Sequence, residues 1–206
     1  MKNLVPVVSA LLSISVLSGC AHRGTVSSVQ ATNIYSDNDS KIKSKVKYSI
    51  DDTSLSKLRK DDAVQGMQCA AHKFPVDAED AFVSSLPSML DSIFENVVKA
   101  EAARSSDTEL SLLFRVERFE PRVKFNPKFF SSDAEATVEL SISVTGSKNG
   151  SRVFGTTVDS QRNRSGDGGG FCEGGGAVLA DATRDVIKDV LEKAGERLAS
   201  SQTLRK

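Results

Sequence analysis

Three stretches of the chain alternate between apolar and polar residues with the period of two that is typical of β-strands. They cover residues 42–50, 109–119 and 134–145. The pair Asn149-Gly150 then favours a tight hairpin turn, because both residues tolerate positive φ angles. Residues 152–161 continue the alternation as a return strand. The pattern therefore predicts four strands, and the lysines on the polar side of 42–50 suit a strand at the edge of the sheet.

Two longer stretches repeat apolar residues with the period of a helix. The first begins at Asp77, a good N-cap residue, and continues to about residue 98, with Pro87 expected to kink or split it. The second covers about 177–200. The order β-α-β-β-β-α predicts an α+β fold. We expect a two-layer sandwich, in which an antiparallel sheet of about four strands carries two amphipathic helices on one face.

Weaker signals lie between the first strand and the first long helix. Leu55 and Leu58 indicate a short helix, and residues 67–74 indicate a brief strand that carries Cys69. These elements and the stronger ones are expected to form a single α+β domain over 41–206.

The first 19 residues have the pattern of a signal peptide. Lys2 precedes an apolar run from Leu4 to Leu17, and small residues follow it. The run is shorter than the ~20 residues that a membrane-spanning helix needs. We therefore predict a signal peptide over 1–19, with a retained transmembrane anchor as the alternative.

The residues Leu17-Ser18-Gly19-Cys20 resemble the lipobox of bacterial lipoproteins. That resemblance implies cleavage before Cys20 and lipidation of this cysteine with diacylglycerol and usually an N-acyl chain such as palmitate. Ala21 follows, where an Asp would favour retention in the inner membrane, so the chain resembles the outer-membrane class. Membrane lipid, bound through the acylated Cys20, is thus the first expected partner, and the expected location is the outer membrane, facing the periplasm.

Residues 20–40 are polar and lack a period, which predicts a flexible, lipidated tether. The element order that follows resembles small envelope lipoproteins such as the YajG type and the auxiliary lipoproteins of ABC-type transport systems. This second resemblance rests on element order alone and implies no functional residues.

Cys69 and Cys172 are the two remaining cysteines. An even pair in an oxidising compartment predicts a disulfide. Two free buried thiols or a metal site are the alternatives, and His22 and His72 are the only histidines that could add ligands. We expect neither a metal nor a cofactor.

A glycine-rich segment, residues 166–176, precedes the last helix and could hold an anion with its backbone N–H groups. It lacks the Lys-Ser/Thr pair of a phosphate-binding P-loop, so we interpret it as a flexible loop that Cys172 holds in place. No G-x-S-x-G motif is present, and His72 alone indicates no catalytic base. The chain is not expected to be an enzyme.

Residues 118–130 combine aromatic and basic side chains with two prolines. The phenylalanines are expected to close the open end of the sandwich. The alternative is an exposed loop that contacts anionic lipid or a protein partner. The candidate partner-binding residues are Phe119, Arg122, Lys124, Phe125, Lys128, Phe129 and Phe130.

The composition excludes little beyond nucleic acid. Basic and acidic residues balance, at 27 each, and the chain has no tryptophan and two tyrosines. The sequence thus predicts a non-enzymatic outer-membrane lipoprotein that acts as an accessory or assembly factor of an envelope complex, with an envelope protein as its second partner. A small-ligand or lipid-binding lipoprotein is the alternative, and a periplasmic hydrolase is the third hypothesis.

Overall fold

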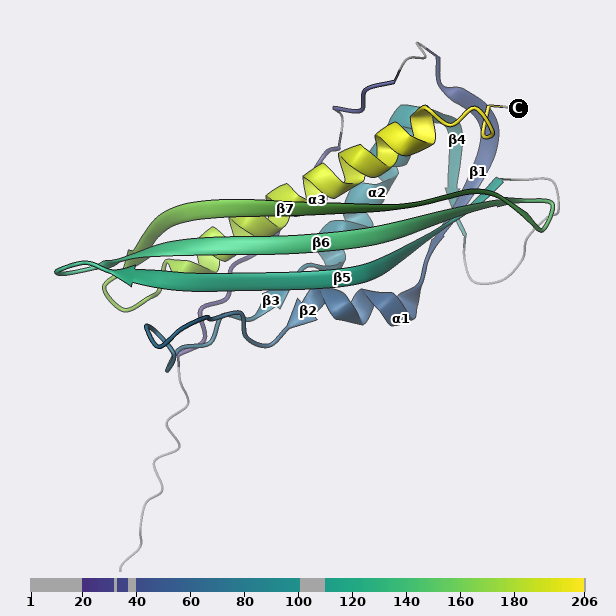
Figure 1. Ribbon diagram of the computed structural model, residues 1–206. Helices are drawn as coiled ribbons and strands as arrows, with labels where there is room; N and C mark the ends of the chain where they lie inside the picture. Colours follow the sequence, from purple (N-terminus) through teal and green to yellow (C-terminus); the bar gives the residue numbers. More distant parts are fainter. Residues whose placement is uncertain (1–19, 32, 37–39, 101–109, 206) are drawn as a thin grey trace, which may run out of the picture.

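The computed structural model describes residues 20–31, 33–36, 40–100 and 110–205, so the expected signal peptide over 1–19 lies outside the described residues. Five strands form the main sheet in the order β4-β1-β5-β6-β7, and two short strands, β2 and β3, pair separately (Figure 1). The strands are β1 (Ile42–Ile50), β2 (Arg59–Lys60), β3 (Val76–Asp77), β4 (Phe94–Lys99), β5 (Leu110–Pro127), β6 (Ser132–Lys148) and β7 (Ser151–Gly169). The helices are α1 (Asp52–Leu55), α2 (Glu79–Ile93) and α3 (Gly175–Ala199), and a 3₁₀ turn, η1, covers Ser56–Leu58.

The α+β class is confirmed, but the sheet is mixed rather than antiparallel. β1 pairs in parallel with both β4 and β5, whereas β5, β6 and β7 form an antiparallel meander. β1 therefore lies inside the sheet, and the prediction that it forms an edge is wrong. Its lysines lie on the polar face instead, where Lys43 and Lys45 are exposed.

β4 is the strand that the sequence pattern missed. The expected helix over 77–98 ends at Ile93, and Phe94 already has extended φ and ψ angles of −112° and 149°. The backbone of residues 94–99 then pairs with β1, and the Phe94 side chain is buried. The apolar residues at 94, 97 and 98 continue the helical stripe. Only the pairing with β1 shows that this segment is a strand and not the end of the helix.

The meander strands are longer than their patterns predict, at 18, 17 and 19 residues, or about 60 Å each. The hairpin turn at Asn149-Gly150 is confirmed, with φ angles of 52° and 74°. At the other end of the meander, the expected loop over 118–130 is instead strand as far as Pro127. Because strand pairing with β6 continues through this region, its side chains alternate between the core and solvent.

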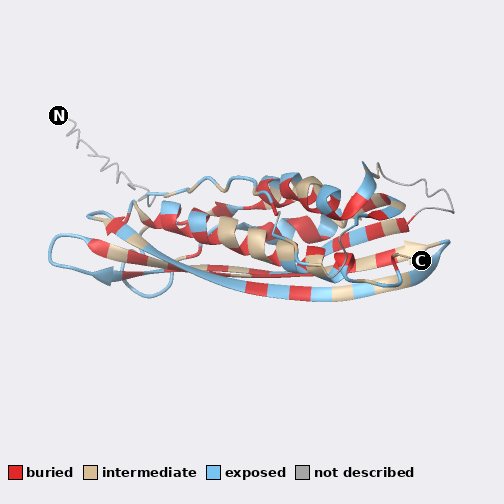
Figure 2. Ribbon diagram, turned by 90° about the horizontal axis from the view of Figure 1, so that it is seen from above, coloured by how far each residue is buried: buried red, intermediate tan, exposed pale blue. Residues whose placement is uncertain are grey.

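α2 and α3 lie on one face of the sheet, and buried positions alternate with more exposed ones along the strands (Figure 2). The apolar stripe of α3 is buried along its whole length, which confirms the predicted last helix. α2 continues through Pro87 without being split. The short helix expected around Leu55 and Leu58 is also present, as α1 and η1, and both leucines are buried. Because α1 adds a third helix, the predicted pair of helices is only roughly right.

The N-terminal segment departs most from expectation, because residues 20–36 pack against the domain as far as they are described. Gly24 lies against the first turn of α3, and the Val29 N–H donates a 2.8 Å hydrogen bond to Ser85 Oγ of α2. Ala31 is fully buried, and the Ile34 side chain lies where a Cβ on Gly195 would contact it. The segment that was expected to be a tether therefore lies along α2 and α3, where a few spaced apolar residues hold it.

Candidate functional site

Cys20 lies directly on the folded domain rather than at the end of a tether. Its thiol is free and exposed. Its carbonyl oxygen accepts a 3.0 Å hydrogen bond from the Lys73 N–H, and the next residue but one, His22, donates its N–H to the Lys73 carbonyl over 2.8 Å. Any group attached to the thiol therefore starts at the surface of the domain. Among the described residues, no helix combines the length and hydropathy needed to cross a membrane.

The disulfide between Cys69 and Cys172 is present, with the two Cα atoms 6.1 Å apart. It joins the turn around Cys69 to the connection between β7 and α3. The brief strand expected over 67–74 is wrong, because Cys69 sits in this turn with a φ angle of 61°. Cys172 has a similar φ angle of 65°, so both half-cystines adopt the left-handed conformation.

Both histidines lie beside Cys20 and contact each other. His22 Nε2 and His72 Nδ1 are 2.8 Å apart, so one ring donates a hydrogen bond to the other. The His22 ring also stacks on Phe74, which packs on Phe125 with the ring centroids 5.1 Å apart. The stack connects the N-terminal segment to the core. Among the described residues, no three histidine, cysteine or acidic side chains come together as metal ligands would.

The glycine-rich segment over 166–176 is not a flexible loop. Its first part belongs to β7, and α3 begins at Gly175. The Gly174 and Gly175 N–H groups, which an anion would need, already donate to the carbonyls of Gly168 and Cys172. A Cβ on Gly175 would lie 2.3 Å from the Phe125 ring, and one on Gly176 would lie 2.5 Å from the His22 carbonyl oxygen. These glycines let the first turn of α3 pack closely on the core and on the N-terminal segment.

Gly176→Ala should displace the N-terminal segment from α3 while the rest of the domain stays folded. The overlap with the His22 carbonyl would cost about 1–3 kcal/mol of local packing, and alanine itself favours a helix. Because about 1.4 kcal/mol corresponds to a tenfold change in population, we expect trypsin to cut after Arg23 roughly 5- to 100-fold faster. Gly170→Ala is the control, since its Cβ would lie an ordinary 3.8 Å from the nearest atom. Equal cleavage rates in the two variants would show that the segment is not packed here.

The candidate partner-binding residues occupy three different environments. Phe119 and Phe125 point into the core and are only 2% and 5% exposed, so these two rings pack in the domain and do not belong to an exposed loop. The basic residues lie on the polar face of the meander in cross-strand ion pairs: Arg122 with Glu139, Lys124 with Glu135 and Lys128 with Asp133. Phe129 and Phe130 alone, in the turn between β5 and β6, are exposed as predicted, at 90% and 87%. Partner binding by this pair stays a prediction.

Two further apolar residues join this aromatic pair at the same end of the domain. Phe171 is 80% exposed in the connection between β7 and α3, and Met67 is 95% exposed in the turn that carries Cys69. The disulfide ties these two segments together, and a Cβ on Gly170 would contact the Phe130 carbonyl. We call Met67, Phe129, Phe130 and Phe171 the apolar tip. Sequence reasoning missed Met67 and Phe171, because each is an isolated apolar residue in a polar segment.

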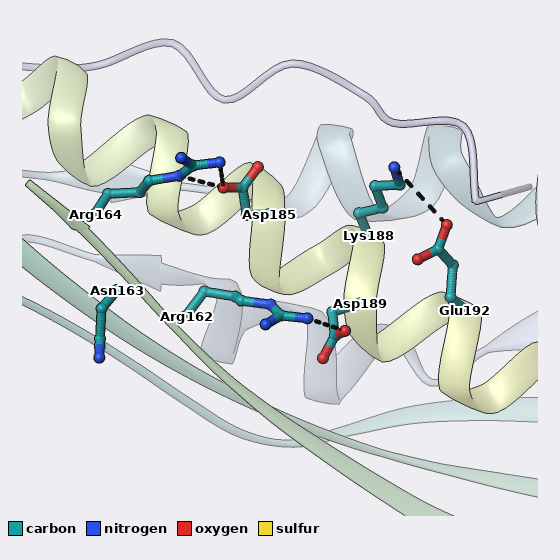
Figure 3. A pocket seen from close by; sticks show the side chains of 7 residues that line it. All are labelled: Arg162, Asn163, Arg164, Asp185, Lys188, Asp189 and Glu192. Atoms are coloured by element: carbon teal, nitrogen blue, oxygen red, sulfur yellow. Dashed lines mark hydrogen bonds and ion pairs between the residues drawn. The ribbon is translucent and has the colours of Figure 1, made fainter. Parts of the chain in front are cut away.

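A charged groove lies between β7 and α3, with a volume of about 350 Å³ (Figure 3). Its side chains pair across the two elements: Arg162 of β7 with Asp189 of α3, and Arg164 with Asp185. Burial alone would raise the pKa of Asp189, but hydrogen bonds from Ser160 and Lys193, together with the positive charges of Lys193 and Arg162, lower the pKa overall. The carboxylate therefore stays ionised and holds α3 against β7.

Beside this groove, β7 forms one edge of the sheet, and no described strand pairs with its outer side. Lys193 and Thr203 donate hydrogen bonds to the carbonyls of Asp159 and Val153 in its first part. Residues 161–165 follow as five consecutive exposed positions. This stretch leaves an extended backbone accessible next to the groove.

Comparison with known proteins gives likenesses of fold only. No model of a protein family matches the chain, and no curated protein matches it. A minor lipoprotein from Acinetobacter baumannii is similar over 78% of this chain and 93% of its own, with 11% identity and a TM-score of 0.45. A DUF330 protein from Xanthomonas campestris is similar over 88% of this chain and 91% of its own, with 18% identity and a TM-score of 0.40. At these identities and scores, the likenesses assign neither a family nor a function.

Proposed function

We propose that this protein is a non-enzymatic lipoprotein of the outer membrane that faces the periplasm and acts as an accessory or assembly factor of an envelope complex. The observation that carries the proposal is Cys20, the last residue of the lipobox-like segment, which lies exposed on the domain surface. A buried methylene contributes about 0.8 kcal/mol to membrane binding, so two or three acyl chains on Cys20 would hold the protein permanently. The disulfide supports an oxidising compartment outside the inner membrane.

The packing of the domain supports a protein partner over a small ligand. A ligand site between the sheet and the helices would require space in that layer. The layer instead contains large side chains that are fully buried, among them Phe82, Phe114 and Ile142. Charged side chains of the β7–α3 groove form ion pairs with one another, which fits a structural contact between β7 and α3 better than a site for a small ligand.

We place the partner at the outer edge of β7, over residues 161–165. An unpaired strand edge offers backbone N–H and C=O groups to an added strand, and the side chains of the groove beside it can select the added sequence. The partner would thus contribute an extended segment of an envelope protein. Anchoring the domain in the same membrane raises its effective concentration near such a partner.

Photo-crosslinking in living cells tests this placement. A photoreactive amino acid at position 163 of β7 should give a discrete crosslinked species in the membrane fraction, whereas the same group at position 95 of β4, on the opposite edge of the sheet, should not. Both positions are exposed, so labelling depends on what lies beside them. The same species from both positions, or none from position 163, would rule out the β7 edge as the partner surface.

A further inference from the structure

We propose that the apolar tip is a membrane-contact surface that enters the interfacial region of the bilayer in which the acyl chains of Cys20 are embedded. The protein would then stand on the membrane with Met67, Phe129, Phe130 and Phe171 facing the lipid. The inference rests on the lipid anchor of the proposed function, but it goes beyond it because it assigns an orientation and a second lipid contact.

The apolar tip differs from ordinary exposed apolar residues because it gathers side chains from three segments. Single exposed apolar residues are common on soluble proteins, whereas clusters of them mark a contact with lipid or protein. Phe129 and Phe130 pack edge to face, with ring centroids 4.4 Å apart, and remain almost fully exposed. The Cys69–Cys172 disulfide joins the segments that carry Met67 and Phe171.

The position of Cys20 identifies the occupant as lipid. Cys20 is hydrogen-bonded to Lys73, and the His72 N–H of the same turn donates to the Cys69 carbonyl over 2.9 Å. Cys69 is in turn linked to Cys172, the neighbour of Phe171. The turn between β5 and β6 and the connection from β7 to α3 lie at the same end of the molecule (Figure 1). Acyl chains on Cys20 would therefore bring the bilayer to the end of the domain that carries the apolar tip.

Three charged side chains near the apolar tip have partners within the protein, which lowers the cost of placing them at an interface. Lys128 and Asp133 form an ion pair with a 2.6 Å separation. The Glu173 carboxylate accepts the Phe171 N–H at 2.8 Å, and its pKa is lowered chiefly by such backbone hydrogen bonds.

The opposite end of the domain offers a matched comparison. Tyr35 is also 80% exposed, and it lines a hollow with residues of the last turns of α3, including Glu196 and Arg197. α3 has 25 residues and is therefore about 37 Å long. Because the apolar tip lies near its first turn, a bilayer in contact with the tip would leave Tyr35 in water.

Tryptophan fluorescence can test the orientation directly, since the chain has no tryptophan of its own. Lipidated Phe130→Trp and Tyr35→Trp proteins would be reconstituted into protein-free vesicles of phosphatidylethanolamine and phosphatidylglycerol with brominated acyl chains. Bromine quenches tryptophan only where the ring reaches the lipid. We expect several-fold stronger quenching and a shift of the emission to shorter wavelength for Phe130→Trp, and neither effect for Tyr35→Trp.

The other outcomes separate this inference from the proposed function. If both proteins float with the vesicles and neither is quenched, the lipid anchor holds but the apolar tip does not contact lipid. In that case, a crosslink from a photoreactive amino acid at position 130 in cells would show that a protein covers the apolar tip. Equal quenching at both positions would mean that the domain lies flat, which also contradicts the inference. If the proteins do not float with the vesicles, the anchor itself fails, and the proposed function falls together with the inference.

Discussion

Cys20→Ala is expected to move the protein from the membrane fraction almost completely into the soluble periplasm. Acyl chains supply the anchor in this account, and each methylene contributes about 0.8 kcal/mol. Removing two or three chains therefore removes most of the membrane affinity. The apolar tip is the only other membrane contact in this account. Cell fractionation followed by immunoblotting measures the change.

The control for this experiment is the double variant Cys69→Ala/Cys172→Ala, which removes the other two thiols and leaves Cys20 in place. It should remain in the membrane fraction. Continued membrane association of Cys20→Ala, with the leader removed, would contradict lipid anchoring at this residue.

The same double variant should lose about 4–5 kcal/mol of the free energy of unfolding. The two cysteines are 103 residues apart, and a crosslink of that span restricts the unfolded chain strongly in the chain-entropy account. Urea denaturation of the soluble Cys20→Ala protein, with and without the two further substitutions, measures the difference. A loss below about 1 kcal/mol would mean that the crosslink contributes little to stability.

The φ angles of the two half-cystines sharpen this prediction. Both exceed 60°, a conformation that costs a residue with a Cβ about 1–2 kcal/mol and glycine almost nothing. Cys69→Gly/Cys172→Gly should therefore be more stable than the double alanine variant, even though glycine makes the unfolded chain more flexible. The opposite order of stability would show that these turns relax once the disulfide is gone.

The sequence predicted the elements whose patterns are local. The alternation over 134–145, the Asn149-Gly150 turn and the helical stripe from 177 identify β6, the hairpin and α3 without any knowledge of their neighbours. Phe94, Val97 and Val98 have the i, i+3, i+4 spacing of a helix, so the formation of β4 depends on a parallel pairing with β1, a strand far away in the sequence. The prolines and aromatic residues of 118–130 indicated a loop, but pairing with β6 extends β5 through Pro121 to Pro127.

The candidate site follows the same division. The pairing of Cys69 with Cys172 could be predicted from the cysteine count, whereas the lipidation of Cys20, which the lipobox-like motif indicates, stays a prediction. Only half of the apolar tip could be predicted: Phe129 and Phe130 were among the candidates, whereas the segments that carry Met67 and Phe171 come together only through the disulfide and the packing of the turn at Phe130. The ion pairs of Arg162 and Arg164 could not be predicted either, because they depend on which face of α3 lies over β7.

The most direct test of the account is the intact mass of the protein purified from membranes, together with the mass of its N-terminal peptide. We predict a chain that begins at Cys20 and carries a diacylglycerol group and an additional N-acyl chain. An unmodified Cys20, or a chain that retains residues 1–19, would contradict the lipid anchor and with it the proposed location and role.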